Sequence, residues 1–200
     1  MGADRIARRY RGQGARQYEL KRAGKLKWQL EHEAVAALLP PLALTVLDVP
    51  VGTGRFLELY RARGMKVTGI DTSPDMLAEA ERRARGLPGP EFITLRQGDI
   101  RALQSADRSF DVAVCIRLLN WFTPAEMRAA IVELGRVASR VIVGIRFAPG
   151  AAEVNEAGTL WRHDWQDLLD ALTEGDLNVE EERPLKPGAD YKILRLVKCA

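Results

Sequence analysis

An acidic residue followed by two closely spaced glycines indicates a ligand-binding loop near the start of the chain. Residues 46–56 read VLDVPVGTGRF, in which an apolar run ends at Asp48 and Gly52 and Gly54 follow. Because glycine has no Cβ atom, a ligand can approach the backbone closely at these two positions. The free amide groups of a helix that begins after such a loop favour a carboxylate or a phosphate. The pattern therefore predicts a site for a small molecule.

The spacing within this loop argues against two common nucleotide sites. A dinucleotide-binding loop has the pattern G-x-G-x-x-G, and Leu57 stands where its third glycine would be. A phosphate-binding P-loop requires G-K-[S/T], whereas Gly54 is followed by Arg55 and Phe56. The sequence of this loop therefore argues against an NAD(P)-binding oxidoreductase, which is kept as a less favoured alternative.

Two further acidic residues end apolar segments later in the chain. Asp71 ends MKVTGID at residues 65–71, and Asp99 ends EFITLRQGD at residues 91–99. The carboxyl ends of parallel strands meet at one edge of a sheet, and ligands bind there at the point where the strand order reverses. Each acid alone could equally cap a helix or a turn, because Asp favours such positions. The common spacing of Asp48, Asp71 and Asp99 favours a shared site.

The elements that position these residues alternate between strands and helices. We predict a first helix from Lys27 that ends at Pro40-Pro41, five strands with helices between them, and two closing strands joined by a KPGAD turn. The predicted strands are 42–49, 65–71, 91–99, 109–116, 140–147, 177–185 and 191–199; the predicted helices are 53–64, 72–86, 123–139 and 163–172; and residues 148–160 are predicted to form a loop.

This order of elements predicts the fold class. Strands that alternate with helices form a parallel sheet with right-handed crossovers, and two strands joined directly must be antiparallel. We therefore expect an α/β, doubly wound, mostly parallel seven-stranded sheet with a C-terminal antiparallel hairpin and helices on both faces. Residues 28–200 would form one domain after a basic N-terminal arm at residues 1–27.

On these residues the chain resembles the class I, Rossmann-like methyltransferases that use S-adenosylmethionine. The resemblance covers roughly residues 28–198 and rests on four motifs in register: the loop that follows Asp48 in a D-x-P-x-G-T-G form, the acids Asp71 and Asp99, and FDVAVCIRLLNWF after the third acid. It implies that Asp71 binds both ribose hydroxyls. It also implies that Asp99 receives the adenine amino group and that Asp48 lies near the methionine amine.

The resemblance implies a wider set of cofactor-binding residues. Ile100 and Met76 would pack on the two faces of the adenine, and the carbonyl of Cys115 or Ile116 would meet the amine. Pro50 has no backbone N–H, so the loop has one fewer donor for the cofactor. The predicted set is Asp48, Pro50, Gly52, Gly54, Phe56, Asp71, Thr72, Met76, Asp99, Ile100, Cys115 and Ile116.

The acceptor is expected beyond the fourth strand of the chain. Arg117, Asn120 and Trp121 follow this strand and Arg146 ends the next, so we predict that they line the acceptor pocket. RLLNWF stands where enzymes that methylate nucleobase amines carry Asn/Asp-Pro-Pro-Tyr/Phe, which weakens a nucleobase acceptor. A small polar or anionic acceptor, methylated by in-line transfer, is therefore predicted. His163 is the candidate general base, with a structural histidine as the alternative.

Composition narrows the remaining possibilities. The longest apolar runs fall short of the roughly 18–20 residues that span a bilayer, and Cys115 and Cys199 are too few for a disulfide framework or a zinc site, so we expect no transmembrane segment, no metal and a cytoplasmic location. The N-terminal arm carries nine Lys and Arg residues and two acids. It could be mobile, act as a lid, or bind RNA or an anionic surface. A non-catalytic binding module of the same fold stays an alternative.

Overall fold

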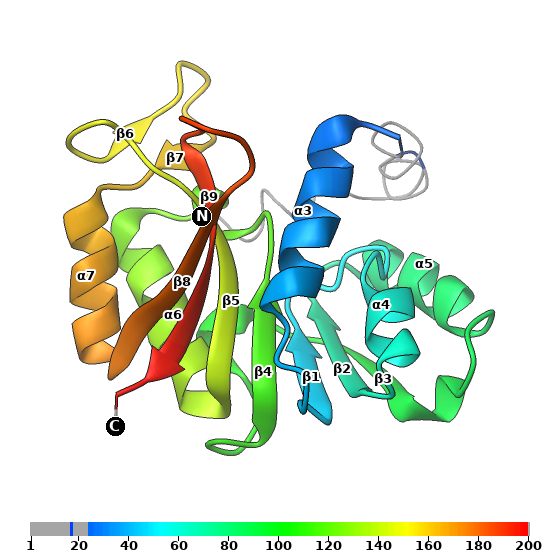
Figure 1. The fold of residues 1–200 in the computed structure, drawn as a ribbon. Helices are drawn as coiled ribbons and strands as arrows, with labels where there is room; N and C mark the ends of the chain where they lie inside the picture. The colour runs from blue at the N-terminus through cyan, green and yellow to red at the C-terminus, as the bar shows by residue number, and fades with distance from the viewer. Residues whose placement is uncertain (1–16, 18–23, 200) are drawn as a thin grey trace.

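The predicted alternation of strands and helices is present in the computed structural model, which describes Gln17 and residues 24–199 (Figure 1). Residues 1–16 and 18–23, most of the predicted basic arm, lie outside the described residues. The longer helices are α3 (Leu26–Leu38), α4 (Leu57–Ala62), α5 (Pro74–Ala84), α6 (Pro124–Val137) and α7 (Trp165–Glu174). The strands of the main sheet are β1 (Thr45–Asp48), β2 (Lys66–Asp71), β3 (Ile93–Gln97), β4 (Phe110–Cys115), β5 (Ala138–Arg146), β8 (Leu177–Pro184) and β9 (Tyr191–Lys198).

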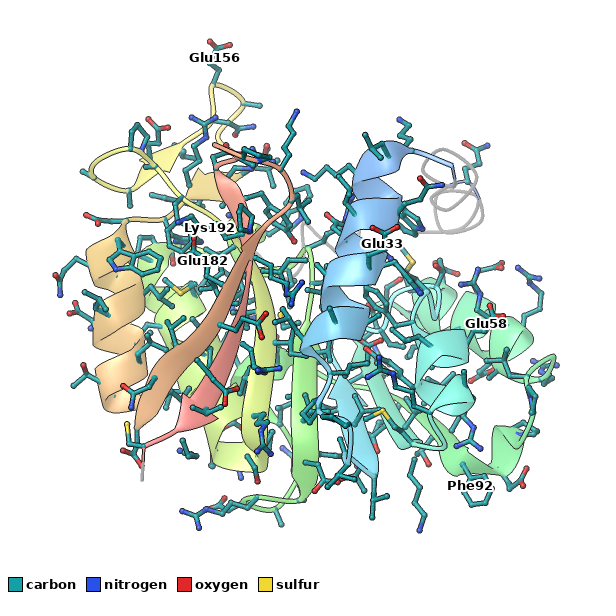
Figure 2. The ribbon with its side chains drawn as sticks, viewed as in Figure 1. Glu33, Glu58, Phe92, Glu156, Glu182 and Lys192 are labelled. Atoms are coloured by element: carbon teal, nitrogen blue, oxygen red, sulfur yellow. The ribbon has the colours of Figure 1, made fainter. Side chains whose placement is uncertain are left out.

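The seven-stranded sheet confirms the predicted fold class. Its strand order is β3-β2-β1-β4-β5-β9-β8. The first five strands of this order are parallel, whereas β9 pairs antiparallel with both β5 and β8. An ion pair of 2.7 Å between Lys192 and Glu182 adds a side-chain contact between β9 and β8 (Figure 2). Because β1 pairs with both β2 and β4, the strand order reverses at β1, and a ligand site is expected at its carboxyl end.

Helices cover both faces of the sheet and bury a hydrophobic layer on each. Helices α3, α4 and α5 pack on one face, where Val46 of β1 and Val112 of β4 are fully buried (Figure 1). Helices α6 and α7 pack on the other face, where Leu47 and Ala113 of the same strands are fully buried. Successive strand residues thus face opposite layers, and the doubly buried strands explain the apolar runs of the sequence.

Side chains cap the starts of two helices. The Thr123 side chain accepts a hydrogen bond from the Glu126 amide, and the Glu126 side chain accepts one from the Thr123 amide, which forms a capping box at the start of α6. Ser73 caps α5 by accepting from the Met76 amide at 3.3 Å. The start of α5 directly after Asp71 fixes one wall of the ligand site.

The segment between β5 and α7 differs from the prediction. The predicted loop at residues 148–160 contains β6 (Glu153–Val154), which pairs antiparallel with β7 (Trp161–Arg162). His163 was predicted to open the last long helix, but it forms a bridge to Phe147, and α7 begins at Trp165 after the N-cap Asp164. Strands of two residues are too short to show an alternating pattern, so the sequence gives no periodic signal for them.

The observed first strand, β1, is shorter than the predicted strand at residues 42–49. It begins at Thr45, and Leu42 and Leu44 before it are 90% and 71% exposed.

No helix of the described residues is long and apolar enough to cross a membrane.

Candidate active site

A cavity opens at the carboxyl ends of β1, β2 and β4, where the strand order reverses. It encloses about 800 Å³, counting the space open to solvent. Its wall consists of Trp28, Val49, Pro50, Val51, Gly52, Thr53, Arg55, Phe56, Asp71, Thr72, Met76, Gly98, Ile116, Arg117, Leu118 and Trp121.

The glycine loop after β1 forms the floor of this cavity. Gly52 has a φ of 55° and Gly54 a φ of 76°, in the left-handed region that favours glycine. A Cβ atom at Gly52 would meet nothing within 4 Å, so the space above this residue is open to a ligand. A Cβ atom at Gly54 would lie 2.6 Å from the Leu57 side chain, so this glycine allows α4 to pack closely on the loop.

Asp71 places a buried carboxylate on the cavity wall. Its Oδ2 accepts a hydrogen bond from the Gly52 amide at 3.0 Å, and its Oδ1 accepts one from the Ser73 amide at 2.8 Å. Burial raises the pKa of this carboxyl, and the backbone hydrogen bonds from Ser73 and Gly52 oppose that shift. The carboxylate is therefore held in a fixed direction between the glycine loop and α5.

Asp48 lies below the loop and not on the cavity wall. It is 2% exposed, and its Oδ2 has no hydrogen-bond partner within the part of the chain that the structure describes. Burial raises the pKa of this carboxyl well above its usual range, against the opposing charge of Arg55. Asp48 is thus placed beneath the residues that line the cavity.

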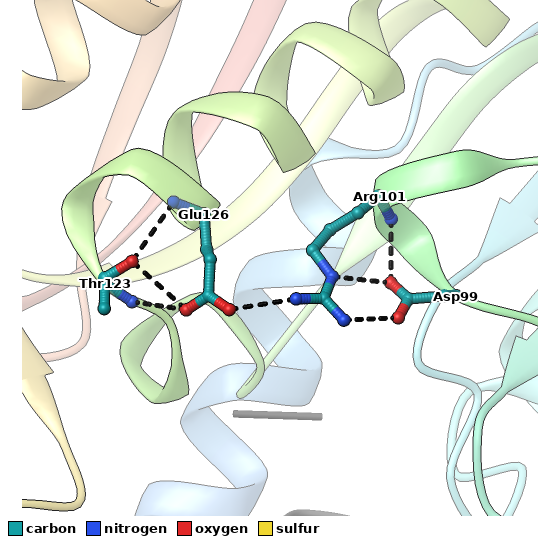
Figure 3. A network of polar contacts seen from close by, with 4 residues as sticks. All are labelled: Asp99, Arg101, Thr123 and Glu126. Carbon is teal, nitrogen blue, oxygen red and sulfur yellow. Dashed lines mark hydrogen bonds and ion pairs between the residues drawn. The ribbon is translucent and has the colours of Figure 1, made fainter. Parts of the chain in front are cut away.

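Asp99 forms an ion pair with Arg101 (Figure 3). Arg101 donates to its Oδ2 at 2.6 Å and to its Oδ1 at 3.0 Å, and also donates to Glu126 at 2.9 Å. The Arg101 hydrogen bonds hold the pKa of Asp99 below its usual value. At this strand end Gly98 lines the cavity, while Ile100 is buried in the core. Arg101, in η2 (Ile100–Ala102), therefore links Asp99 to the capping box of α6.

The structure brings together many of the predicted cofactor residues. Pro50, Gly52, Phe56, Asp71, Thr72, Met76 and Ile116 lie on the cavity wall. Asp48, Gly54, Asp99, Ile100 and Cys115 do not line it. The peptide bond between Val49 and Pro50 is cis.

Of the four residues predicted to line the acceptor pocket, two line the cavity and two do not. Arg117 and Trp121 line the cavity, next to Leu118. Asn120 lies behind them: its Nδ2 donates to the carbonyls of Trp161 and Arg146 at 2.8 and 3.3 Å, so it ties η3 (Leu119–Trp121) to β7 and β5. Arg146 does not line the cavity and donates to both carboxylate oxygens of Asp190 at 2.6 and 2.8 Å.

His163 is fully buried and absent from the cavity wall. Its Nε2 lies 3.0 Å from the Leu119 carbonyl, and its backbone amide donates to the Arg146 carbonyl at 2.9 Å. Burial lowers the pKa of its imidazole, which favours the neutral ring. These contacts match the structural alternative, in which His163 joins η3 and β5.

Sequence reasoning considered Trp28 only as part of a lid over the cofactor, and it assigned no role to Arg55 or Glu31 at the same end of the cavity. Trp28 and Arg55 line the wall, and Glu31 lies behind them with no exposed surface. Glu31 Oε2 accepts from Arg55 Nη1 at 2.8 Å and from Arg117 Nε at 2.7 Å. Arg55 and Arg117 are 24 and 86 residues away from Glu31 in the sequence, so no local motif predicts these contacts.

Comparisons with known proteins identify the family. A model described as a methyltransferase domain matches residues 46–140. A phosphatidylethanolamine N-methyltransferase of Cereibacter sphaeroides is 33% identical over 161 residues, which cover 75% of this chain and 78% of that protein. The chain belongs to the class I S-adenosylmethionine-dependent methyltransferases. This confirms the predicted family and sets aside the oxidoreductase and non-catalytic alternatives.

Two further comparisons agree with this methyltransferase assignment. A malonyl-[acyl-carrier protein] O-methyltransferase of Serratia marcescens is 29% identical over 117 residues, covering 58% of this chain and 43% of that one. The structure of the magnesium protoporphyrin IX methyltransferase of Synechocystis PCC 6803 with S-adenosylhomocysteine superposes with a TM-score of 0.80 at 17% identity and full coverage of both chains. The latter similarity shows the shared fold.

The cavity fits the cofactor of the family, S-adenosylmethionine. The open space above Gly52 allows close approach to the backbone, and Asp71 offers a buried carboxylate that can accept hydrogen bonds from two neighbouring hydroxyls. Thr72, Met76 and Gly98 form the wall on the β3 side. Among the described residues, no group of three or more His, Cys, Asp or Glu side chains is placed to hold a metal ion.

Proposed function

We propose that this methyltransferase acts on a small acceptor that carries an anionic group. The observation that carries the proposal is a gathering of cations around Tyr191, beside the Arg117 end of the cavity. Lys27 Nζ lies 4.7 Å from the centre of the Tyr191 ring, and Arg146 Cζ lies 5.9 Å from it. Arg117 lies on the adjoining cavity wall.

The electrostatics of these groups favour an anion. The pKa of Lys27 is lowered first by burial and then by the positive charge of Arg146. The carboxylates close to this region are already shared: Glu31 binds both Arg55 and Arg117, and Asp190 binds Arg146 and also Arg162. An acceptor with a phosphate or a carboxylate would reduce the repulsion among the cations.

The cavity wall also supports a mechanism that works by positioning. Bound S-adenosylmethionine supplies an electrophilic methyl group on a sulfonium. Among the described wall residues, the ionisable side chains are Asp71, Arg55 and Arg117, and Asp71 is held by two backbone amides. These described residues include no neutral base, so we infer that they act by positioning a nucleophile that reaches the methyl group unprotonated. Trp121 and Leu118 would orient it and exclude water.

The relatives give independent support for this acceptor class. Phosphatidylethanolamine, named for the Cereibacter sphaeroides relative, combines a phosphate with an amine that can be methylated. The malonyl group named for the Serratia marcescens relative carries a carboxylate. The first acceptor joins an anionic group to a separate nucleophile, whereas in the second the anionic carboxylate can itself be the nucleophile.

The proposal is tested by measuring S-adenosylhomocysteine release with matched pairs of acceptors. Each pair shares a nucleophile and differs in one anionic group, such as phosphoethanolamine against ethanolamine, or 4-aminobenzoate against aniline. We expect turnover of anionic members at least tenfold above their neutral partners. Equal turnover of the two members of each reactive pair would contradict the proposal.

A variant locates the anion-binding groups. Arg146→Gln should raise the KM for the anionic acceptor several-fold and leave kcat within about twofold. Arg128→Gln is the matched control, because Arg128 also pairs with one carboxylate, Asp170, but lies on α6, which packs on the other face of the sheet from Tyr191. An unchanged KM in Arg146→Gln would remove Arg146 from acceptor binding.

A further inference from the structure

The short turn η3 carries one end of the cavity wall. Leu118 and Trp121 line the cavity, and they flank Leu119 and Asn120, the first two residues of the turn. Within the turn, the Trp121 amide donates to the Leu118 carbonyl at 2.8 Å, and the Phe122 amide donates to the Leu119 carbonyl at 3.1 Å. A 3-10 turn of this length makes few hydrogen bonds of its own, so contacts from other segments decide where it lies.

His163 holds the first residue of this turn. Its Nε2 lies 3.0 Å from the Leu119 carbonyl oxygen, and its ring has no exposed surface. Because a carbonyl oxygen can only accept, Nε2 is the ring nitrogen that carries the proton. The His163 amide donates to the Arg146 carbonyl at 2.9 Å, which anchors this residue to the end of β5. His163 therefore connects η3 to β5.

Asn120 holds the second residue of the turn through its own side chain. Its Nδ2 donates to the Trp161 carbonyl at 2.8 Å and to the Arg146 carbonyl at 3.3 Å. Its Oδ1 accepts from the Arg146 amide at 3.2 Å. A buried amide side chain that lost these partners would leave polar atoms unsatisfied, which is costly. Asn120 is therefore fixed against both β5 and β7.

These hydrogen bonds join the two parts of the proposed acceptor site. Asn120 and His163 both bind the backbone of Arg146, the arginine proposed above to bind the anionic group. The next residue of the turn, Trp121, lines the cavity. Trp161 and His163 belong to one short segment that begins at β7, the second strand of the hairpin with β6. The segment therefore sets the spacing between the Trp121 wall and Arg146.

We propose that Asn120 and His163 are positioning residues for the acceptor. They act through Trp121 and Arg146 and place these two groups at the separation that the acceptor requires. The β6–β7 hairpin is thereby a part of the acceptor site, although it follows the last of the family motifs. The inference rests on the proposed function in one respect, namely that the acceptor binds at Trp121 and Arg146.

Two variants of His163 in the full-length protein test this role. His163→Leu removes the donor to Leu119, whereas the side-chain amide of His163→Gln restores a donor. The acceptor is whichever of phosphoethanolamine, ethanolamine, 4-aminobenzoate and aniline turns over fastest. We expect His163→Leu to raise its KM by about fivefold or more, with kcat and the affinity for S-adenosylhomocysteine within about twofold, and His163→Gln to restore the KM. An unchanged KM in His163→Leu would overturn the inference.

A spectroscopic measurement tests the same role without an acceptor. The four tryptophans of the chain can be labelled as 5-fluorotryptophan, and Trp121→Phe identifies the fluorine NMR signal of Trp121. With S-adenosylhomocysteine bound, His163→Leu and Asn120→Ala should each shift or broaden the Trp121 signal more than that of Trp28, which lines the cavity from α3. Asn120→Ala provides the result if His163→Leu does not fold. An unchanged Trp121 signal in the folded variants would overturn the inference.

Thr45→Val is the matched control for a loss of stability alone. The Thr45 hydroxyl also joins two segments, since it donates to the Asp111 carboxylate at 3.0 Å and accepts from the Asp111 amide at 2.9 Å, at the other ends of β1 and β4. This variant should leave the KM and the Trp121 signal unchanged. A KM raised as much as in His163→Leu would show a general effect on the fold and overturn the inference.

The acceptor class and the positioning role can fail separately. If anionic and neutral acceptors turned over equally while His163→Leu still raised the KM, the proposed acceptor class would be wrong and the positioning role would be supported. If anionic acceptors were preferred but neither the KM nor the Trp121 signal changed in the variants, the acceptor class would be supported and the positioning role would be wrong.

Discussion

The Asp71 carboxylate accepts a hydrogen bond from the Gly52 amide at 3.0 Å, which joins the end of β2 to the glycine loop of β1. The same carboxylate accepts from the Ser73 amide at the start of α5. One buried side chain thus sets the spacing of the loop, the strand end and the helix that surround the cavity. Two parts of the family pattern that are 19 residues apart in the sequence are in direct contact.

Asp71→Asn should weaken cofactor binding. Replacing a carboxylate that accepts from two ribose hydroxyls removes charge-assisted hydrogen bonds, which are worth about 1.5–3 kcal/mol. The dissociation constant for S-adenosylhomocysteine, measured by calorimetry, should rise at least tenfold. Asp111→Asn is a suitable control, because Asp111 also accepts from backbone amides, those of Leu44 and Thr45 at the other end of β1. Wild-type affinity in Asp71→Asn would contradict the assigned role.

His163 should make the stability of the protein depend on pH. Burial lowers its pKa in the folded state, so the unfolded chain binds a proton more readily below pH of about 6.5. The contribution of His163 to the free energy of unfolding should therefore be constant above that pH and fall below it, by at most about 1.4 kcal/mol per pH unit. Urea unfolding should show that His163→Gln removes this part of the pH dependence.

Turnover separates this structural role from the predicted catalytic one. Loss of a general base typically costs about 10²–10⁴ in rate. Because His163 is buried behind the cavity wall, we expect kcat per folded molecule to stay within a few-fold in His163→Gln. A drop of a hundredfold, with the fold intact, would restore His163 as the base.

The two loop glycines should differ in their response to alanine. Both have positive φ, which costs an L-residue about 1–2 kcal/mol. Gly54→Ala adds a contact of 2.6 Å with the Leu57 side chain, whereas Gly52→Ala meets no atom within 4 Å. Urea unfolding should therefore show the larger destabilisation for Gly54→Ala. Gly52→Ala should mainly weaken S-adenosylhomocysteine, because its methyl group enters the open space of the cavity. Equal loss of stability in the two variants would contradict this distinction.

The Asp99–Arg101 pair should contribute little to stability. Both side chains are about one-third exposed, and ion pairs in that setting are typically worth about 0.2–1 kcal/mol. Arg101→Gln should therefore lower the free energy of unfolding by no more than about 1 kcal/mol, as measured in urea. A loss above 2 kcal/mol would show that the link to Glu126 supports α6 far more strongly.

Local patterns made most of the fold predictable. The alternation of apolar strands with capped helices specified a parallel sheet, and the joined strands at the end specified the antiparallel hairpin. Thr123 and Glu126 signalled the start of α6 because a capping box lies within four residues. Asp71 and Gly52 were predictable for a similar reason, since each stands at a strand end or in a turn with a recognisable composition.

Contacts between distant segments were not predictable. An acid at a strand end gives the same signal whether it faces a ligand or a cation. The network in which Arg101 holds Asp99 and also contacts Glu126, 25 residues away, was therefore not predictable from the sequence. Glu31 resembles any acidic residue of a surface helix until the fold places it between Arg55 and Arg117. The position of His163 depended on the two-residue strands β6 and β7, which have no periodic pattern.

A crystal structure of the complex with S-adenosylhomocysteine tests the account most directly. It should show the ribose hydroxyls on the Asp71 carboxylate, the adenine between Met76 and Gly98, and the sulfur facing Leu118 and Trp121. Ribose hydroxyls bound away from Asp71, or a sulfur directed away from Trp121, would contradict the assignment of this cavity.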